Sequence, residues 1–232
     1  MALFHRLQRA VPRACTYFDR RLVPAVRDAA RFGKGRLLDV GCGTKPFENY
    51  FDVKQYVGID VPSSEIRDSK RDISASGMQM PFKDGFFDTV LCTEVLEHVP
   101  EPHMLLTEIN RVMKKGGCLI LSTPQSWSTH GAPHDYYRYT EFGLWHLAKK
   151  SGFRVVSIKS TTGTFSLIGQ FLSQFIWHTH SGWNSRSRVR YVFEVMLLPV
   201  CLFIQAAFLL LDKIYGNRGD VLNNVMVARK NS

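Results

Sequence analysis

The sequence predicts an α/β fold with a doubly wound, mostly parallel sheet. From Leu37 to Ser160, short apolar runs alternate with stretches whose apolar residues recur at helical spacing. This alternation is typical of parallel strands joined by helices that cover both faces of a sheet. A turn with two glycines, Gly41-Cys42-Gly43, follows the first apolar run directly, as it does in nucleotide-binding sheets. The 232 residues are enough for one large domain with an insertion, so two independent domains are not expected.

The individual elements are read from these runs in order. Two helices are expected: Pro102–Lys114, and Thr140–Ser151 with Thr140 as N-cap and Gly152 as C-cap. Apolar runs bounded by turn residues predict the strands. They are Arg36–Val40, Tyr56–Asp60, a weaker strand near Lys70–Ile73, Phe87–Cys92, Gly117–Ser122, Phe153–Lys159 and a final strand Asn224–Lys230.

An apolar, helical insertion is expected before the last strand, from Thr161 to Leu222. It holds two long apolar segments, Phe165–Trp177 and Val192–Leu211, where a compact domain needs only a helix and a turn. Because the last strand is expected to rejoin the sheet, a single transmembrane crossing is excluded. A membrane-surface hairpin is favoured, in which basic residues between the two segments meet lipid headgroups. A buried cap over the functional site, or a dimer interface, is the alternative. The basic residues are Arg186, Arg188 and Arg190.

Three parts of the chain are therefore expected. Residues 1–35 form a basic N-terminal helical segment, residues 36–160 together with 223–232 form the core, and residues 161–222 form the insertion. In the first part Arg6, Arg9 and Arg13 precede any acid, which favours a basic amphipathic helix over an organelle presequence.

The charge and the cysteines limit the partners and the compartment. Thirty basic against twenty acidic side chains give a net charge of +10, which favours an anionic partner such as a membrane surface. The five cysteines show no metal-binding or disulfide spacing, which is typical of reduced thiols in the cytoplasm. They are Cys15, Cys42, Cys92, Cys118 and Cys201.

The glycine turn and the next strand predict a nucleotide-like ligand. Glycines let backbone amides approach a ligand closely. A nicotinamide cofactor would favour a third glycine, but Pro46 stands at that position. Asp60 ends the second strand beside the turn, where its carboxylate can accept both hydroxyls of a ribose; a helix cap or turn residue is the alternative. Asp39 either contacts the ligand or braces its own loop.

These residues resemble those of class I S-adenosylmethionine-dependent methyltransferases, especially methyltransferase type 11. The likeness runs from Leu37 to Lys159 and includes the motifs Met80–Asp88, Thr93–Val99 and Arg111–Gly117. It implies a Rossmann-like methyltransferase fold with a seven-stranded sheet, and S-adenosylmethionine as the cofactor. The implied cofactor contacts are Asp39, Gly41, Cys42, Gly43, Asp60, Val61, Ser76, Gly77, Met78, Thr93 and Glu94.

Two residues depart from the pattern of this family. Ser76 stands where relatives often carry an acid that contacts the adenine amine, so either the Ser76 hydroxyl or Asp72 takes that role. Lys45 replaces a glycine that many relatives carry, and it reduces the room expected around the methionine end of the cofactor.

A group of titratable residues follows the fourth strand. Glu94, Glu97 and His98 are expected on one face of a helix at the carboxyl edge of the sheet. The pattern also resembles ubiquinone-pathway O-methyltransferases, where it is associated with a divalent metal. Packing and capping are the alternative roles. We assign no metal site from the sequence and take His98 as a catalytic candidate.

A second group, His130 to Thr140, is expected to form a lid over the substrate. His134 is a candidate base that Asp135 orients. Tyr137 and Arg138 are substrate candidates, with Arg138 holding a phosphate or carboxylate. The loop resembles a signature of bacterial relatives linked to cell-envelope glycan or lipid pathways. The alternative is that its tyrosines seal the core and Arg138 pairs with a nearby acid.

Together these features predict a methyltransferase in the cytoplasm, peripheral to the membrane. The expected reaction is O-methylation of a small-molecule, glycan or lipid-linked acceptor. A catalytically silent module that binds a membrane or a partner is the alternative. Nucleic acid is not expected as a substrate despite the basic charge, because the chain lacks Asn-Pro-Pro-Tyr and Pro-Cys signatures.

Overall fold

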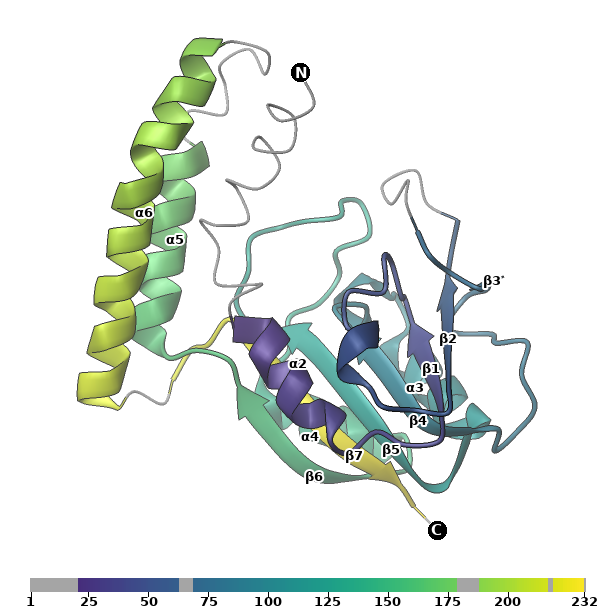
Figure 1. Cartoon of the computed structure of the whole chain (residues 1–232). Helices are drawn as coiled ribbons and strands as arrows, with labels where there is room; N and C mark the ends of the chain where they lie inside the picture. Colours follow the sequence, from purple (N-terminus) through teal and green to yellow (C-terminus); the bar gives the residue numbers. More distant parts are fainter. Residues whose placement is uncertain (1–20, 63–68, 179–187, 217–218, 232) are drawn as a thin grey trace. The chain divides into compact units, whose positions relative to one another are not determined.

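The computed structural model describes residues 21–62, 69–178, 188–216 and 219–231 (Figure 1). The chain divides into two compact units. One consists of Met1–Val23 and Thr161–Leu222, and the other of Pro24–Ser160 and Asn223–Ser232. Some residues named in the sequence analysis lie outside the described residues: Arg6, Arg9 and Arg13 of the predicted N-terminal amphipathic segment, Cys15 and Arg186.

The larger unit is built on a seven-stranded sheet with the order β3-β2-β1-β4-β5-β7-β6, which confirms the predicted fold class. All pairings from β3 to β5 are parallel, and β7 lies antiparallel between β5 and β6. The strands are β1 (Arg36–Val40), β2 (Gln55–Asp60), β3 (Ile73–Ser74), β4 (Phe87–Thr93), β5 (Met113–Pro124), β6 (Phe153–Ser160) and β7 (Asn223–Lys230).

Helices cover both faces of this sheet because alternate strand residues point to opposite sides. The helices are α2 (Val23–Ala30), α3 (Pro102–Val112) and α4 (Glu141–Lys150). Met226 and Ala228 of β7 join the core cluster beneath α3 and α4. Val225 and Val227 lie on the other face, in a shallow cavity that α2 also lines. The sequence analysis had placed α2 in the N-terminal segment.

Two predicted helix ends need correction. The α3 helix ends at Val112, because Met113 takes an extended conformation, is fully buried and pairs with Phe87 of β4. Burial in the sheet thus overrides the helical preference of this apolar and basic stretch. The predicted N-cap of α4 is confirmed, since the Thr140 hydroxyl accepts a hydrogen bond from the Gly143 amide at 3.1 Å. The C-cap is Ser151, and Gly152 follows it with a φ of +81°.

The smaller unit is a helical hairpin of α5 (Thr164–His178) and α6 (Arg188–Tyr215), which lie side by side in Figure 1. The helices are antiparallel, since a Cβ at Gly169 of α5 would lie 2.8 Å from the Phe208 Cβ and the Cys201 thiol contacts the Ser173 carbonyl. Asp212 of α6 caps the start of α5. Its carboxylate accepts hydrogen bonds from the amides of Gly163, Phe165 and Ser166, at 3.0 to 3.2 Å.

This hairpin is polar inside and apolar outside. Its fully buried side chains include four polar ones, Ser166, Gln170, Ser173 and Gln205. Large apolar side chains are exposed along both helices, and the segment Met196–Tyr215 is long and apolar enough to span a bilayer. Soluble helical pairs show the opposite distribution, whereas helices in lipid pack through small and polar residues. The exposed residues include Ile168, Phe171, Phe175, Met196, Phe203, Leu210 and Ile214.

Candidate functional site

A cavity of about 290 Å³ opens at the carboxyl ends of β1, β2 and β4. This is the point where the strand order reverses, and open α/β sheets bind their ligands in the crevice at such a point. Several apolar side chains, among them Val40, Val95 and Leu105, form part of its wall. Eight residues predicted from the sequence also line it: Gly41, Asp60, Val61, Ser76, Gly77, Met78, Glu94 and His98.

The glycine turn is tied to the second strand at the floor of this cavity. Gly41 has a φ of +69°, and a Cβ at this position would overlap the Val95 side chain. A glycine is therefore required on both conformational and steric grounds. The amides of Gly41 and Cys42 donate to the Ile59 carbonyl at 2.9 and 3.0 Å. The protein's own backbone thus fixes the position of the turn.

Asp60 projects its carboxylate into the same cavity. One oxygen accepts a hydrogen bond from the Gly43 amide at 3.0 Å, and the other accepts one from the Val61 amide at 2.8 Å. Each carboxylate oxygen has a second lone pair, so two further donors can bind. The arrangement fits a ribose, whose vicinal hydroxyls would donate to the two oxygens.

The remaining predicted cofactor residues lie outside the cavity wall. Cys42 is buried with its sulfur against Gly58, and Thr93 ends β4 half-buried. Gly43 serves through its amide, which holds Asp60. Asp39 is 1% exposed and accepts a hydrogen bond from the Tyr56 hydroxyl at 2.6 Å. These contacts support the bracing role that the sequence left open for Asp39.

Ser76, Gly77 and Met78, which are predicted to contact the adenine, line one side of the cavity. The Ser76 hydroxyl accepts a hydrogen bond from the Met78 amide at 3.2 Å and shapes this turn. Asp72, the alternative adenine contact, binds elsewhere: its carboxylate accepts from the Lys45 ammonium and the Gly58 amide, both at 2.7 Å. Partial burial opposes ionisation, but these two donors hold the pKa of Asp72 below its usual value. Lys45 is thereby drawn to Asp72 and does not line the cavity.

Asp39 provides a test of this bracing role through pH. Burial raises its pKa to about 7, although the Tyr56 hydroxyl and Lys45 oppose the shift. An unfolded aspartate has a pKa of about 3.9, so the folded state binds this proton more tightly. The Asp39 contribution to stability is therefore complete below pH 4 and is lost as the pH rises through 7.

We expect Asp39→Asn to remove this pH dependence. Between pH 4 and pH 8 the wild type should lose the Asp39 contribution while the variant does not. The free energy of unfolding of the variant minus that of the wild type should therefore rise by up to about 4 kcal/mol. Urea denaturation at several pH values measures the difference. A constant difference across this range would show that Asp39 is ionised in the folded protein.

The segment after β4 does not form the predicted helix. Glu94 has a φ of +54° and precedes a single 3-10 turn, Leu96–His98, so Glu94 and His98 do not share a helix face. The Glu94 carboxylate accepts hydrogen bonds from Ser122 at 2.7 Å and Asn223 at 2.8 Å. Burial raises the pKa of Glu94 to about 7, and these two hydrogen bonds oppose the shift.

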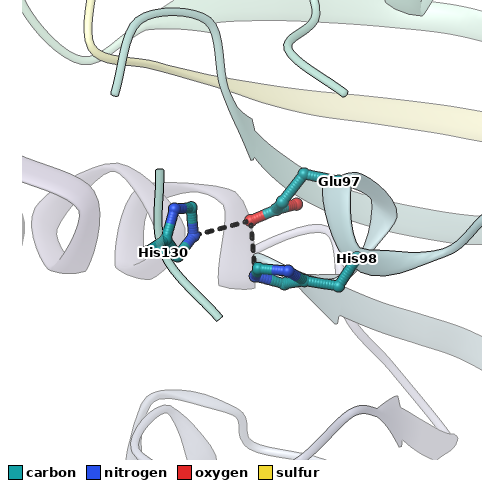
Figure 2. A group of neighbouring side chains, drawn as sticks. All are labelled: Glu97, His98 and His130. Atoms are coloured by element: carbon teal, nitrogen blue, oxygen red, sulfur yellow. Dashed lines mark ion pairs between the residues drawn. The ribbon is translucent and has the colours of Figure 1, made fainter. Parts of the chain in front are cut away.

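Glu97 lies between two histidines, His98 and His130, and its side chain is fully buried (Figure 2). Its Oε1 atom is 3.7 Å from the Nε2 of His98 and 3.9 Å from the Nε2 of His130. No hydrogen bond reaches this oxygen within the described part of the chain. Burial, followed by the nearby Glu94 carboxylate, raises the pKa of Glu97 well above its usual value. The sequence analysis grouped Glu97 with His98 and placed His130 in the lid, but it gave neither residue a catalytic, cofactor-binding or substrate-binding role and did not bring the two together.

Backbone carbonyls orient both histidines. The Nδ1 of His98 lies 2.7 Å from the His134 carbonyl oxygen, which can only accept, so this nitrogen carries the proton. The Nδ1 of His130 lies 3.1 Å from the Ser128 carbonyl, while an Arg138 nitrogen lies at 3.4 Å. The shorter contact favours a proton on this Nδ1 as well. Both Nε2 atoms are then left as acceptors that face Glu97.

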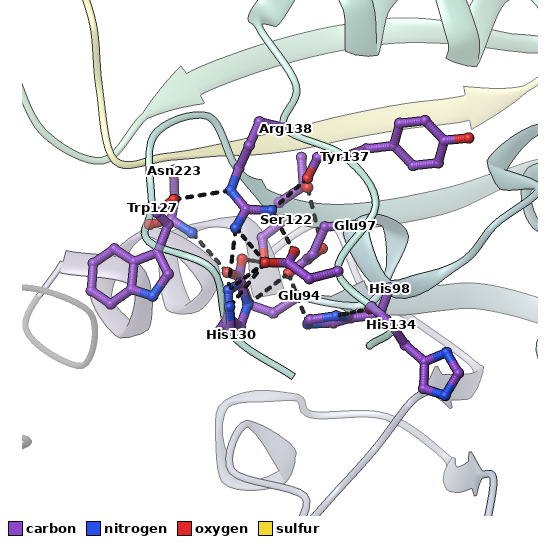
Figure 3. A network of polar contacts seen from close by, with 12 residues as sticks. Glu94, Glu97, His98, Ser122, Trp127, His130, His134, Tyr137, Arg138 and Asn223 are labelled. Atoms are coloured by element: carbon purple, nitrogen blue, oxygen red, sulfur yellow. Dashed lines mark hydrogen bonds and ion pairs between the residues drawn. The ribbon is translucent and has the colours of Figure 1, made fainter. Parts of the chain in front are cut away.

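The predicted lid residues form a closed polar network (Figure 3). Arg138 binds both oxygens of Asp135 at 2.6 and 2.8 Å, and it also donates to the carbonyls of Trp127 and Ser128. The hydrogen bonds from Arg138 strongly lower the pKa of Asp135, and burial opposes this shift. The alternative of an ion pair between Arg138 and a nearby acid is therefore confirmed. The contact of Arg138 with a substrate anion stays a prediction.

The predicted pairing of His134 with Asp135 is wrong. The His134 ring contacts the Tyr136 hydroxyl at 3.0 Å, whereas Asp135 accepts a hydrogen bond from the His130 amide at 2.9 Å. His134 does not line the cavity. Tyr137 is partly exposed and donates to the carbonyl of Pro100, a residue of the cavity wall, at 3.0 Å. Of the three predicted catalytic residues, the structure brings His98 alone to the cavity.

The fold and the site together define the class of the larger unit. A doubly wound sheet with an antiparallel β7, a glycine turn after β1 and a carboxylate at the end of β2 are the features of a Rossmann-like methyltransferase. Residues 38–121 match the family described as "Methyltransferase domain". This segment is a class I methyltransferase domain, of the class that uses S-adenosylmethionine.

Comparison with individual proteins supports this assignment. The ubiquinone biosynthesis O-methyltransferase of Dechloromonas aromatica is 33% identical over 101 residues, which covers 38% of this chain and 44% of that protein. The [4+2]-cyclase SpnF is 23% identical, with a TM-score of 0.59 over 91% of this chain and 81% of its own. Phosphoethanolamine N-methyltransferase 2 of Haemonchus contortus, whose structure contains S-adenosyl-L-methionine, is 18% identical. Its TM-score is 0.56, and the match covers 90% of this chain and 53% of that protein. The matches to curated relatives span less than half of their length.

Proposed function

We propose that this chain transfers a methyl group from S-adenosylmethionine to a hydroxyl of a membrane-associated acceptor. The observation that carries the proposal is the Asp60 carboxylate, held by the Gly43 and Val61 amides inside the cavity above the glycine turn. A ligand with a ribose next to a flat aromatic base fits the lining of this cavity. The match to a methyltransferase domain over residues 38–121 supports the same ligand.

The residues of the cavity fit the cofactor part by part. Asp60 would accept hydrogen bonds from the ribose hydroxyls, and Val61 and Met78 offer apolar surface to the adenine. Gly41, without a side chain, leaves room for the methionine end. Bound S-adenosylmethionine supplies a methyl group that its sulfonium charge has already activated, so the protein mainly aligns the acceptor and removes a proton.

His98 is the candidate general base. Its Nδ1–H donates to the His134 carbonyl, so its Nε2 lone pair is free to accept a proton, and the ring lines the cavity. Bound S-adenosylmethionine would supply the methyl group, and the Nε2 of His98 would accept the proton that the acceptor hydroxyl loses as it is methylated. The reaction would leave S-adenosylhomocysteine and a methyl ether.

The hairpin of α5 and α6 supports a membrane-borne acceptor. Its polar residues are buried and its apolar residues are exposed, which is favourable in lipid and unfavourable in water. The strand before it, β6, and the strand after it, β7, pair in one sheet. The segment between them must therefore enter and leave a membrane on the same side. A hairpin embedded from the cytoplasmic face meets this condition.

We expect the double substitution Phe175→Asp and Phe203→Asp to reduce membrane binding at least about tenfold. These side chains are 68% and 74% exposed, and each buried phenylalanine contributes roughly 1.5–3 kcal/mol in an apolar environment. Flotation of the full chain with vesicles of phosphatidylcholine and phosphatidylglycerol measures the bound fraction. Phe142→Asp, at a 77% exposed position on α4, is the matched control. Equal flotation of wild type and the double variant would exclude a lipid-facing hairpin.

Titration calorimetry with S-adenosylmethionine tests the catalytic part of the proposal. One molecule should bind per chain, and incubation with labelled cofactor and a membrane lipid extract should yield a labelled lipid. An absence of binding would overturn the proposal. Binding without transfer to any fraction would favour a catalytically silent module with the same fold.

A further inference from the structure

The structure assigns a divalent transition-metal site to Glu97, His98 and His130. The three ligand atoms, one carboxylate oxygen and two imidazole nitrogens, lie within 4.8 Å of one another. Figure 2 shows both rings directed at the same oxygen. The site is inferred from this geometry, and it deepens the proposed function because His98 also lines the cofactor cavity.

The separations suit a shared ion better than direct contacts. Glu97 Oε1 lies 3.7 and 3.9 Å from the two Nε2 atoms, which is too long for hydrogen bonds. Ligand atoms about 2.1 Å from a common ion lie about 3.0 to 3.5 Å apart. Small side-chain movements would therefore close the site around a cation.

The buried carboxylate oxygen is a second, independent observation. Glu97 is fully buried, and its Oε1 has no hydrogen-bond donor among the described residues. Such an atom is costly to leave without a partner. The guanidinium of Arg138, which acts on Glu97 through its charge, is already bound to both oxygens of Asp135. A bound cation would satisfy this oxygen and balance its charge.

The tautomers of the histidines complete the argument. Backbone carbonyls take the Nδ1 protons of His98 and His130, so both Nε2 lone pairs point to the proposed ion. Histidine ligands of metals usually have their other nitrogen fixed in this way. The Glu94 carboxylate, by contrast, binds Ser122 and Asn223 and is not a member of the site. The third ligand is His130, which lies outside the Glu-x-x-Glu-His motif in the sequence, and not Glu94.

The donor set identifies the class of ion. Two imidazoles and one carboxylate favour first-row transition metals such as Zn²⁺, Co²⁺, Mn²⁺ or Fe²⁺, whereas Mg²⁺ prefers oxygen ligands. Three protein ligands leave coordination positions open, and His98 and His130 are 27% and 35% exposed. An acceptor hydroxyl bound there would lose its proton to solvent water more readily. His98 would then hold the ion, so the bound ion would replace the base role that His98 has in the metal-free site.

Cobalt titration of the full-length protein, stripped of metal with a chelator, tests the site directly. Visible absorbance should report one Co²⁺ per chain, and Zn²⁺ should displace it. His130→Ala should weaken binding at least about tenfold and change the spectrum. Glu97→Gln, which keeps the size of the side chain, should also weaken binding. His134→Ala is the matched control from the same loop and should bind as wild type does.

Three results would overturn the assignment: no stoichiometric binding by wild type, unchanged binding by His130→Ala, or displacement of Co²⁺ by Mg²⁺ at equal concentration. Circular dichroism of each variant shows that it is folded. The titration contains no S-adenosylmethionine, so its failure would leave the methyltransferase proposal intact. Failure of cofactor binding would likewise leave the metal result standing.

Discussion

Asp60→Ala is expected to weaken the binding of S-adenosylhomocysteine by at least about 100-fold. The substitution removes two hydrogen bonds from ribose hydroxyls to a charged acceptor, each of about 1.5–3 kcal/mol. It also releases the Gly43 amide, which the carboxylate holds at 3.0 Å, so the glycine turn loses a contact that orders it. Titration calorimetry with the product measures the loss without turnover.

Two further variants make this result specific. Asp60→Asn keeps one acceptor oxygen and should give an intermediate affinity. Asp52→Ala removes an exposed acid in the loop before β2 and should bind the product as wild type does. If Asp60→Ala bound with an affinity within about threefold of wild type, the ligand would not be held by its ribose at this residue.

Arg138→Ala is expected to lower the free energy of unfolding by about 3 kcal/mol, because it leaves Asp135 buried without its partner. The Asp135 side chain is 4% exposed, and Arg138 binds both of its oxygens. Two backbone carbonyls of the loop, those of Trp127 and Ser128, lose a donor as well. Urea denaturation measures the change.

The choice of controls separates a structural role from a charge effect. Arg154→Ala removes an exposed arginine on β6 and should change stability by less than about 0.5 kcal/mol. Arg138→Lys keeps the charge but not the bidentate geometry, so it should recover part of the loss. A loss below about 1 kcal/mol for Arg138→Ala would mean that Asp135 finds water or another donor, and that the loop is less well packed than its contacts indicate.

The fold by itself does not decide the reaction. SpnF, a [4+2]-cyclase, shares this architecture with methyltransferases. Chemistry therefore depends on the side chains near the cavity, in this chain His98 and its neighbours. Methyl transfer and metal binding should both be measured. Methyl transfer tests the proposed use of the cofactor, and metal binding tests the proposed role of the histidines beside the cavity.

The sequence by itself determined the sheet, the glycine turn and Asp60. The strands were readable because their apolar runs are short and are bounded by turn residues, so β1 was predicted to the residue. Gly41 and Asp60 were readable because they follow strand ends directly, and parallel strands bring their carboxyl ends to one edge. Position along the chain was enough to place these residues.

Only the tertiary structure decided the direction of the polar side chains around the cavity. Glu94 turns to Asn223, a residue 129 positions away, and its backbone takes a positive φ that no periodicity indicates. Arg138 binds Asp135, and His130 joins Glu97 and His98 from a separate loop. Spacing along a chain gives the face of a regular element, but it does not give the direction of a side chain in a turn. That direction depends on which distant groups satisfy its hydrogen bonds.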